Sequence, residues 1–434
     1  MRALPPDAAV PEGFAMRRRL GVAAVAALTV HAAFLPLSIA MMQLSLGALL
    51  AALAGQRLAG APAWARSALD VPVLTLAGAA VLSIGLAALA GSPPVGFREA
   101  TRWWSLLAPL AVLSALEQPG GADGGDAETV RRRVVLVLAA WAAASLLPSA
   151  LAWAQHSWGL DPLHWMGLRR RAVRIPARGW PDRFAAVGFF TWYQRLAHNL
   201  TPPLLLAGAV ALYGGATRRV RWLLGLGAAA AAAAVLLTVS RSSWLGLAAG
   251  GVALAAASGR RLARWAVPAA VAAAALAALA TPGLRSRLSG ALGPEVAQTR
   301  IPIWRVCAAM VEDRPLLGVG FGSAPGRAGP YYDRLAPPDA LRSSCHDSFL
   351  TAWVEGGPLL TAALAFYWWG LFRAFWRWRR GAEGPARAGA AGGLAALVAM
   401  FLNSLVHDVL YSVETTLALG LALGLAAALA RTGR

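Results

Sequence analysis

The sequence predicts an all-α, polytopic membrane protein, and three observations lead to that fold class. Hydrophobic residues make up 58% of the 434-residue chain, and its mean hydropathy is +0.55. Charged residues make up only 14%, where an ordinary soluble domain has roughly 25%. Many apolar runs approach or exceed the roughly 18 residues that a bilayer-spanning helix needs. We therefore expect a single integral membrane domain over residues 1–434.

Arginine clusters next to short connections orient the predicted helices. The predicted spans, in order, cover residues 20–35, 37–54, 70–90, 100–116, 134–152, 197–213, 222–239, 243–257, 265–281, 348–372, 388–406 and 410–429. Arginines at 17–19, 131–133, 218–221 and 260–264 all fall on one side, which is the cytoplasmic side under the positive-inside rule. This threading gives about twelve spans with both termini cytoplasmic. The first span is expected to be a retained helix and not a cleaved signal peptide.

Two long connections fall on the predicted periplasmic side, at residues 153–196 and 282–347. The first is rich in arginine, with Arg169, Arg170, Arg171, Arg174, Arg178 and Arg183. Long loops are largely exempt from the positive-inside rule, so these arginines do not upset the threading. They fit either a solvated basic loop or an electropositive face for a lipid headgroup or phosphate.

The second long connection predicts an amphipathic helix from about Pro302 to Asp313. Trp304, Ala308 and Val311 share its apolar face at i, i+4 and i+7, and Arg305 and Glu312 lie opposite. After that helix, Pro315 and three glycines, Gly318, Gly320 and Gly322, predict an irregular turn.

The remaining composition narrows the function classes. The formal charge is +20 from 40 basic and 20 acidic residues, and every basic side chain is arginine. The arginines are dispersed among the spans, which argues against a nucleic-acid-binding domain. The two cysteines, Cys307 and Cys345, are better explained as small buried residues than as a disulfide framework, although one bridge stays open. No His or Cys spacing matches a zinc site, and we expect no metal and no cofactor.

Polar side chains collect at the predicted outer helix ends. Arg241 in "LLTVSRSSWLGL" lies between two apolar stretches, so it either faces a polar cavity or snorkels to the interface. His346 in "SSCHDSFLTAWVEGG" begins an apolar run, and it is either a helix-cap or interface residue or a general base. "FLNSLVHDVLY" adds Asn403, His407 and Asp408 at another outer end. These groups could converge in one outer cavity.

Three stretches of the chain resemble the O-antigen ligase and polymerase superfamily. "TVSRSSWLGL" is similar to the family's Thr-x-Ser-Arg pattern at a helix end. "RIPIWRVCAAMVEDRPLLGVGFGS" is similar to its Arg-x-x-x-Trp…Pro-Leu-Leu-Gly-x-Gly-x-Gly pattern. "HDSFLTAWVEGG" is similar to its His-Asn/Ser-x-x-Leu…Glu-x-Gly pattern after the large outer loop. The order and placement of the three stretches make the combination more specific than any one of them.

The resemblance implies a helical fold in the GT-C-like class of lipid-sugar-dependent glycosyltransferases. Members take a glycan from undecaprenyl diphosphate on the periplasmic face of the bacterial inner membrane. Ligases attach it to lipid A-core, in lipopolysaccharide biosynthesis, and polymerases attach it to another lipid-linked repeat. The implied partners are the lipid-linked donor, the acceptor, membrane lipids and, for a polymerase, a chain-length regulator.

The resemblance also implies roles for individual residues. His346 matches the family's essential His and Arg241 an essential Arg, which makes both candidate catalytic residues. The candidate substrate-binding residues are Arg98, Arg102, Arg300, Arg305, Asp347 and Asp408. Asp347 stands where the family usually has Asn or Ser, which leaves its role open between orienting His346 and capping a helix.

The expected reaction is inverting sugar transfer without metal. His346 would accept the proton of the acceptor hydroxyl, and arginines would stabilise the departing diphosphate. We expect O-antigen ligation to lipid A-core, with a repeat-unit polymerase as the alternative, since both share this chemistry and the sequence does not separate them. A secondary transporter is the rival class, although transport sites usually lie near the midplane within related repeats, and no repeat is evident here.

Overall fold

The structure is a computed structural model, and it describes residues 12–61, 65–93, 101–117, 126–177, 180, 182–258, 265, 294–337 and 342–433. Over these residues the regular elements are helices, and one isolated bridge joins Pro176 and Phe184. The helices are α1 (Glu12–Phe34), α2 (Ile39–Leu58), α3 (Asp70–Leu89), η1 (Thr101–Leu107), α5 (Ala108–Glu117), α6 (Ala127–Trp158), α7 (Pro162–Trp165), α8 (Tyr193–Tyr213), α9 (Arg218–Leu237), α10 (Arg241–Ser258), α13 (Pro294–Asp313), α14 (Ala324–Arg327), α15 (Gly329–Leu335), α16 (Ser348–Arg379), α17 (Gly384–Ser404), η3 (Val409–Tyr411) and α18 (Val413–Arg431).

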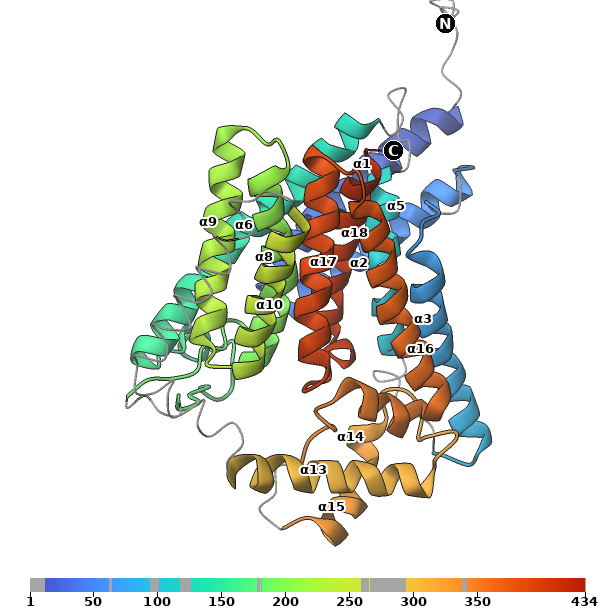
Figure 1. Cartoon of the computed structure of the whole chain (residues 1–434), viewed down its shortest axis with the longest axis vertical. Helices are drawn as coiled ribbons and strands as arrows, with labels where there is room; N and C mark the ends of the chain where they lie inside the picture. Colours follow the sequence, from blue (N-terminus) through green and yellow to red (C-terminus); the bar gives the residue numbers. More distant parts are fainter. Residues whose placement is uncertain are drawn as a thin grey trace, which may run out of the picture.

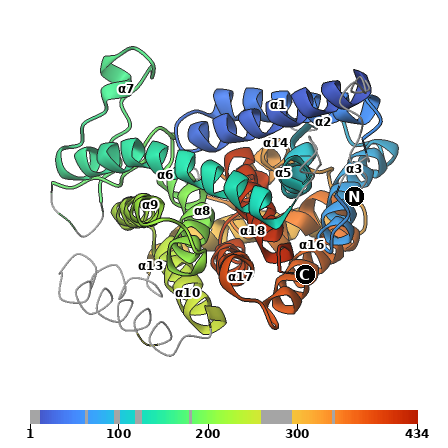
Figure 2. The same ribbon diagram turned by 90° about the horizontal axis from the view of Figure 1, so that it is seen from above.

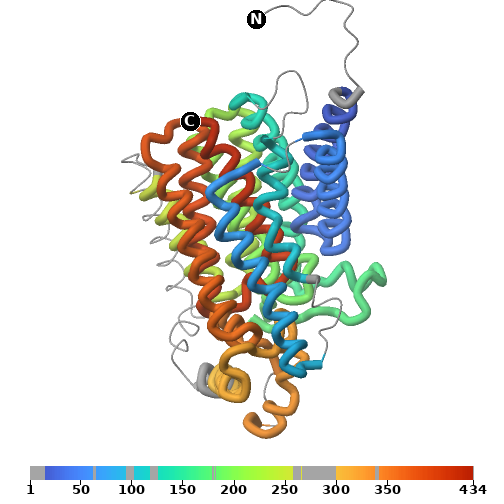
Figure 3. Tube along the Cα trace, turned by 90° about the vertical axis from the view of Figure 1, so that its right-hand side faces the viewer, coloured from blue at the N-terminus to red at the C-terminus, as the bar shows by residue number. Residues whose placement is uncertain are grey.

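The long helices run side by side as one bundle, and α13 lies crosswise under one end of it (Figure 1). We call this end the α13 end. The start of α1 and the end of α18 lie at the opposite end, as do the arginine-bearing starts of α6 and α9 and the end of α16 (Figures 1 and 3). The arginine-bearing helix ends thus gather where the threading expects them. Which side of the membrane that end faces stays a prediction.

Eight described helices are long and apolar enough to cross a membrane, namely α2, α3, α6, α8, α9, α16, α17 and α18. They correspond to eight of the predicted spans, and they confirm the prediction of a multi-pass helical membrane protein. The other four predictions have different outcomes. The span 20–35 lies in α1, which also carries Arg17, Arg18 and Arg19. The span 243–257 lies in α10, which opens with the polar sequence "RSS". The span 265–281 lies outside the described residues apart from Trp265.

The fourth prediction, one continuous membrane-spanning helix over 100–116, is wrong because the helix is not continuous. The chain forms a 3-10 helix, η1, and only then the short α-helix α5. Pro109 is the second residue of α5, and a proline has no N–H to continue the helical ladder backwards. Similarly, α18 begins at Val413, because Val409–Tyr411 forms the separate 3-10 turn η3.

The centre of the bundle is α18, whose residues are almost all buried. It packs against α5, α8 and α17 (Figure 2). Close approach depends on glycines: a Cβ on Gly424 would lie 2.5 Å from Val112 of α5, and one on Gly389 of α17 would lie 2.5 Å from the Ala426 carbonyl. Small residues permit this packing between membrane helices, where dispersion contacts provide much of the association energy.

Two segments join helices at the α13 end. The first segment, residues 159–192, is shorter than predicted because α6 continues to Trp158 and α8 begins at Tyr193. The second segment, residues 294–347, contains α13, α14 and α15. Its amphipathic helix begins at Pro294 and not at Pro302, so Pro302 lies inside it. The irregular turn after Asp313 is confirmed: Gly318, Gly320 and Gly322 all have positive φ.

The predicted apolar face of α13 is wrong for two of its three residues. Trp304 and Ala308 are exposed, whereas Ile303, Val306, Cys307 and Met310 are buried in a small core with α15 and the start of α16. Val311, the third predicted residue, is half-buried against this core. Both faces of this helix carry apolar residues at helical spacing, so periodicity alone could select either. Arg305 and Glu312 are exposed, as expected.

Candidate functional site

His346 is held by its own backbone at the point where the second segment meets α16. Its φ is +52°, a left-handed conformation that non-glycine residues rarely adopt. Its N–H donates to Asp408 Oδ2 at 3.1 Å, and its carbonyl accepts from Arg300 Nη1 at 3.1 Å. Its Nε2 is 2.9 Å from Ser343 Oγ. Residues kept in sparsely populated backbone regions cluster at functional sites, and here two distant side chains maintain the conformation.

Asp408 is the centre of this arrangement. One carboxylate oxygen accepts from the Ser344 hydroxyl and the His346 N–H, and the other accepts from Thr351 Oγ1 at 2.5 Å. The sequence assigned Asp408 to substrate binding. In the structure its described bonds hold the residues on both sides of His346, a geometry that fits a positioning role.

The whole turn between α17 and α18 contributes to the site. Arg300 Nη1 also donates to the Val406 carbonyl at 2.7 Å, and Ser348 Oγ donates to the His407 carbonyl at 2.8 Å. His407 Nε2 is 2.9 Å from Ser242 Oγ, next to Arg241. One turn therefore touches α13, the start of α16 and the start of α10. We call Arg300, His346, His407 and Asp408 the His346 cluster.

Arg241 begins α10 and is half-buried beside this cluster. Val239, two residues earlier, has φ +58°, which is strained for a β-branched residue. Ser240 Oγ accepts from Ser243 and lies 3.3 Å from Ser242 Oγ, so the turn forms a polar network. The Arg241 and Arg300 guanidiniums are close enough to act on each other electrostatically. The site therefore combines two cations, one carboxylate hub and an imidazole.

Burial and the Arg300 charge both lower the pKa of His346, and the nearby Asp408 carboxylate opposes them by raising it. A pKa below the ordinary value near 6.5 keeps the imidazole neutral at neutral pH, so that it can accept a proton. Burial also places the pKa of His407 well below its ordinary value. Its ring lies 5.8 Å from that of His346 and 5.3 Å from that of His198.

Asp347 does not touch the imidazole in the described contacts. Its Oδ1 accepts from the N–H groups of Phe349 and Leu350 at 2.8 and 2.9 Å, so it is the N-cap of α16. This geometry favours the capping alternative of the two that the sequence left open. Burial raises the pKa of Asp347, and its two backbone hydrogen bonds oppose that change.

Sequence reasoning missed the role of Glu355. This buried side chain accepts from the N–H groups of Gly322 and Ala324 at 2.7 and 3.0 Å, and the Gly320 N–H donates to its carbonyl. The glycine turn therefore folds onto α16. At Gly357, with φ +62°, α16 is kinked, and a Cβ there would lie 2.1 Å from the Leu316 carbonyl oxygen. The available signal was the pairing of a Gly-rich turn with the sequence "EGG".

The other predicted arginines have separate positions. Arg102, on η1, is half-buried and acts electrostatically on the Glu355 carboxylate, so it lies on the side of the glycine turn. Arg305 is exposed on α13, and no described contact brings it to the His346 cluster. Arg98 lies outside the described residues.

Cys307 and Cys345 form a disulfide, with their Cα atoms 6.0 Å apart. The preference for two unpaired buried residues was therefore wrong. The linear sequence separates them by 38 residues, and only the packing of α13 against the segment before α16 brings them together. The bridge links α13, which carries Arg300, to the residue directly before His346.

Two arginines of the first segment donate to backbone carbonyls at its base. Arg174 Nε donates to the Gly159 carbonyl and Arg183 Nη1 to the Ser157 carbonyl, at 3.0 and 3.1 Å. Arg169 pairs with the buried Asp161 at 2.9 Å. Arg170 and Arg171 are exposed, and Arg178 lies outside the described residues. Only part of the predicted electropositive face is thus available to a ligand.

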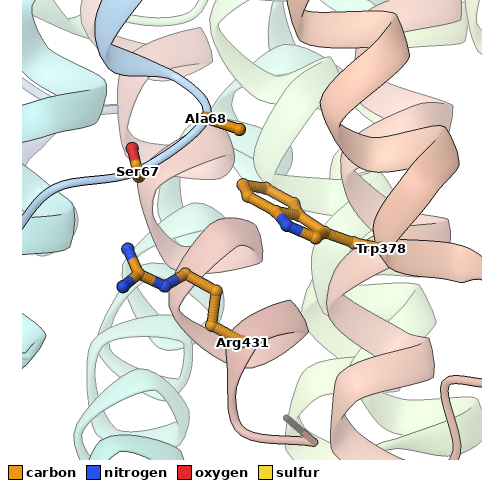
Figure 4. Close-up of a pocket in the computed structure, with 4 residues that line it drawn as sticks. All are labelled: Ser67, Ala68, Trp378 and Arg431. Atoms are coloured by element: carbon orange, nitrogen blue, oxygen red, sulfur yellow. The ribbon is translucent and has the colours of Figure 1, made fainter.

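A pocket lies far from this cluster, at the opposite end of the bundle. Ser67 and Ala68 before α3, Trp378 of α16 and Arg431 of α18 line it (Figure 4). Arg431 Nη1 already donates to the Arg66 carbonyl at 2.8 Å and pairs with Glu117 at 3.2 Å. Within the described part of the chain, no group of three His, Cys, Asp or Glu side chains could hold a metal ion.

Fold and site together define a multi-pass helical membrane protein with a basic, imidazole-bearing cluster where its helices end. A family model described as O-Antigen ligase matches residues 226–364, the stretch that contains Arg241, Arg300 and His346. This match supports the resemblance of the stretch to the O-antigen ligase and polymerase superfamily that its three motifs predict. A comparison with curated proteins gave no match.

The match supports an O-antigen ligase or polymerase type of function. That family implies a glycosyltransferase- or ligase-type enzyme of polysaccharide biosynthesis, with a lipid-linked glycan donor and a glycan or lipid A acceptor. Asp408 lies outside the matched residues, as do Arg98 and Arg102.

Proposed function

We propose that the protein transfers a glycan from undecaprenyl diphosphate to an acceptor hydroxyl on the periplasmic face of the bacterial inner membrane, as an O-antigen ligase acting on lipid A-core. The observation that carries the proposal is the His346 cluster together with the neighbouring Arg241. A neutral imidazole, two arginines and a carboxylate hub meet at the α13 end, drawn from four separate stretches of the chain. That combination suits proton removal next to a departing diphosphate.

In the proposed reaction His346 acts as the general base. The acceptor O–H proton moves to the imidazole while the hydroxyl oxygen forms a bond to the anomeric carbon. The bond from that carbon to the diphosphate oxygen breaks, and its electron pair leaves with undecaprenyl diphosphate. Attack from the face opposite the leaving group inverts the anomeric configuration. The imidazolium then releases its proton to water.

Arg241 and Arg300 stabilise the charge that develops on the diphosphate. A guanidinium fork matches phosphate oxygens better than an ammonium does, and it needs no proton exchange. Such fixed cations in a site partly shielded from water lower the barrier because they are oriented before the charge appears. Arg102 is the third candidate for this role, from the side of the glycine turn.

The test is reconstitution of the purified protein with an undecaprenyl-diphosphate-linked glycan and two separate acceptors. Transfer to lipid A-core supports ligation, and transfer to a second lipid-linked repeat makes the protein a polymerase. Uptake of a solute into proteoliposomes, without either transfer, would overturn the proposal in favour of transport. For Arg241→Lys we expect a weaker donor affinity or a slower rate. Unchanged values for both would remove the phosphate-binding role of Arg241.

A further inference from the structure

Besides the His346 cluster, the α13 end carries an apolar tip on the first segment. We call residues 162–172, which begin with α7, the 162–172 loop. Trp165, Met166 and Leu168 in this loop are 63%, 69% and 71% exposed. Three large apolar side chains this exposed in one short loop form an apolar patch that is unfavourable in water. Such patches mark contact surfaces.

The 162–172 loop has a fixed shape. At its base, Asp161 is 1% exposed and accepts from Arg169 Nη1 and from the Val173 N–H, both at 2.9 Å. Arg169 Nη2 also donates to the Phe190 carbonyl at 2.8 Å, and His164 Nδ1 lies 3.0 Å from the Arg169 carbonyl. The base is thus closed by a buried ion pair, and the three apolar side chains of the tip stay mostly exposed.

The position of the loop indicates what covers the tip. Figure 2 shows α7 standing clear of the bundle, beyond α6, and Figure 3 shows the green segment projecting sideways. On α6, Leu136, Leu147 and Trp158 are 53%, 57% and 56% exposed, and their spacing of three helical turns puts them on one stripe. This stripe runs along the span towards the 162–172 loop, so the exposed tip continues a lipid-facing surface.

The position of the 162–172 loop along the membrane normal also fits contact with lipid. The stretch from Arg133 to Trp153 is roughly 30 Å long at about 1.5 Å per residue, close to the thickness of a hydrocarbon core. Trp153 and Trp158 therefore fall at the membrane boundary, as tryptophans at helix ends commonly do. The loop begins just beyond them, and its exposed Arg170 and Arg171 are of the charge that anionic headgroups attract.

We propose that the 162–172 loop binds the membrane surface beside the bundle. Trp165, Met166 and Leu168 insert into the boundary between headgroups and acyl chains, and Arg170 and Arg171 contact the phosphates of anionic phospholipids. The partner is the lipid surface itself. The inference does not depend on the transfer reaction.

The test uses a spin label on the full-length protein in nanodiscs of phosphatidylcholine and phosphatidylglycerol. The described cysteines are joined in the disulfide, so a new cysteine at position 165 labels selectively. We expect the label in Trp165→Cys to collide with a water-soluble nickel chelate several-fold less often than the label in Leu335→Cys. Leu335, 39% exposed on α15, is the matched control on an element that lies away from the bundle. Oxygen, which partitions into lipid, should reach the first label more readily.

Three results would overturn the proposal. The first is equal access of the nickel chelate to both labels, which would mean that the tip is in water. The second is exclusion of both nickel and oxygen from the label at position 165, which would mean that protein covers it. If Trp165→Cys does not fold, Leu168→Cys replaces it. The third concerns charge: Arg170→Gln combined with Arg171→Gln should raise nickel access only when phosphatidylglycerol is present, and an equal rise without it would remove the role of the arginines.

Discussion

The two segments at the α13 end use arginine in different ways. In the first segment, Arg174 and Arg183 bind carbonyls at the segment's own base, and Arg169 pairs with Asp161 eight residues away. In the second segment, Arg300 binds the carbonyl of Val406, 106 residues further along the chain. The described arginine contacts of the first segment stay close to its own base, whereas Arg300 reaches a distant turn between two spans. The number of arginines does not distinguish the two segments, but the partners of the arginines do.

The largest expected difference between the segments is in transfer activity. Arg300→Gln should lower the rate of glycan transfer by about 100-fold or more, because it removes a cation from the site and the donor that holds the His346 carbonyl. Arg174→Gln is the matched change in the first segment. It loses one hydrogen bond, worth about 1 kcal/mol of stability, and should leave the transfer rate near that of the unchanged protein. Equal losses in the two variants would contradict the distinction.

The next largest expected effect is that of removing the disulfide from the second segment. Cys307→Ser should lower the free energy of unfolding of the second segment by about 3 kcal/mol, since the bridge closes a long loop. Transfer should fall with it, because Cys345 precedes His346. Hydrogen exchange of α13 would measure the change. Added reductant should have the same effect on the unchanged protein and no further effect on Cys307→Ser. Unaltered exchange after complete reduction would mean that the bridge does not order the segment.

Substitutions of Asp408 and Asp347 compare a residue that positions His346 with one that caps α16. Asp408→Asn should slow transfer by about tenfold, because an amide cannot accept on both sides as the carboxylate does for Ser344, His346 and Thr351. Asp347→Asn should change the rate little, since Asn is as good an N-cap as Asp. Steady-state kinetics on both variants would show the difference as a fall in kcat for Asp408→Asn. Similar effects of the two substitutions would contradict the assignment.

The smallest expected effect is a shift in pH dependence. The pKa of His346 is lowered by burial and by Arg300, so the base is neutral above that pKa and protonated below it. Transfer should therefore be flat near neutral pH and fall on the acid side, below pH 6.5. In Asp408→Asn the loss of the carboxylate should lower this pKa further and move the acid limb to lower pH. A limb that moves upward would contradict the charge relation between the two residues.

The sequence predicted the class of fold and singled out candidate site residues, both for identifiable reasons. Apolar length and arginine clusters mark spans well, so eight predicted helices correspond to membrane-competent helices. Arg241 and His346 stand out because charged or titratable groups at the ends of apolar runs are costly and specific, whereas Arg300 was identified only through the family pattern. The sequence suggested that these groups could converge, but it could not give the contacts that join them, because those depend on the turn at Val406–Asp408, which is far away in the sequence.

Two other features could not be predicted from the sequence, one because its pattern was ambiguous and one because it left no pattern. The first is the apolar face of α13, where Trp304 and Ile303 each belong to an apolar stripe at helical spacing. The Ile303 stripe is the buried one, because it carries Cys307, which pairs with Cys345. The role of Glu355 is another. A buried acid that accepts backbone N–H groups of a glycine turn leaves no period in the sequence, and only the fold of residues 316–324 onto α16 reveals it.

The central claim is that His346, held by Arg300 and Asp408, is the base of a glycan transfer. The most direct measurement is the single-turnover rate of glycan transfer by His346→Ala, with affinity for the lipid-linked donor and thermal unfolding measured on the same preparation. We expect the rate to fall by about 100- to 10,000-fold, with donor affinity and unfolding temperature close to those of the unchanged protein. A near-normal rate in a folded His346→Ala protein would contradict the claim.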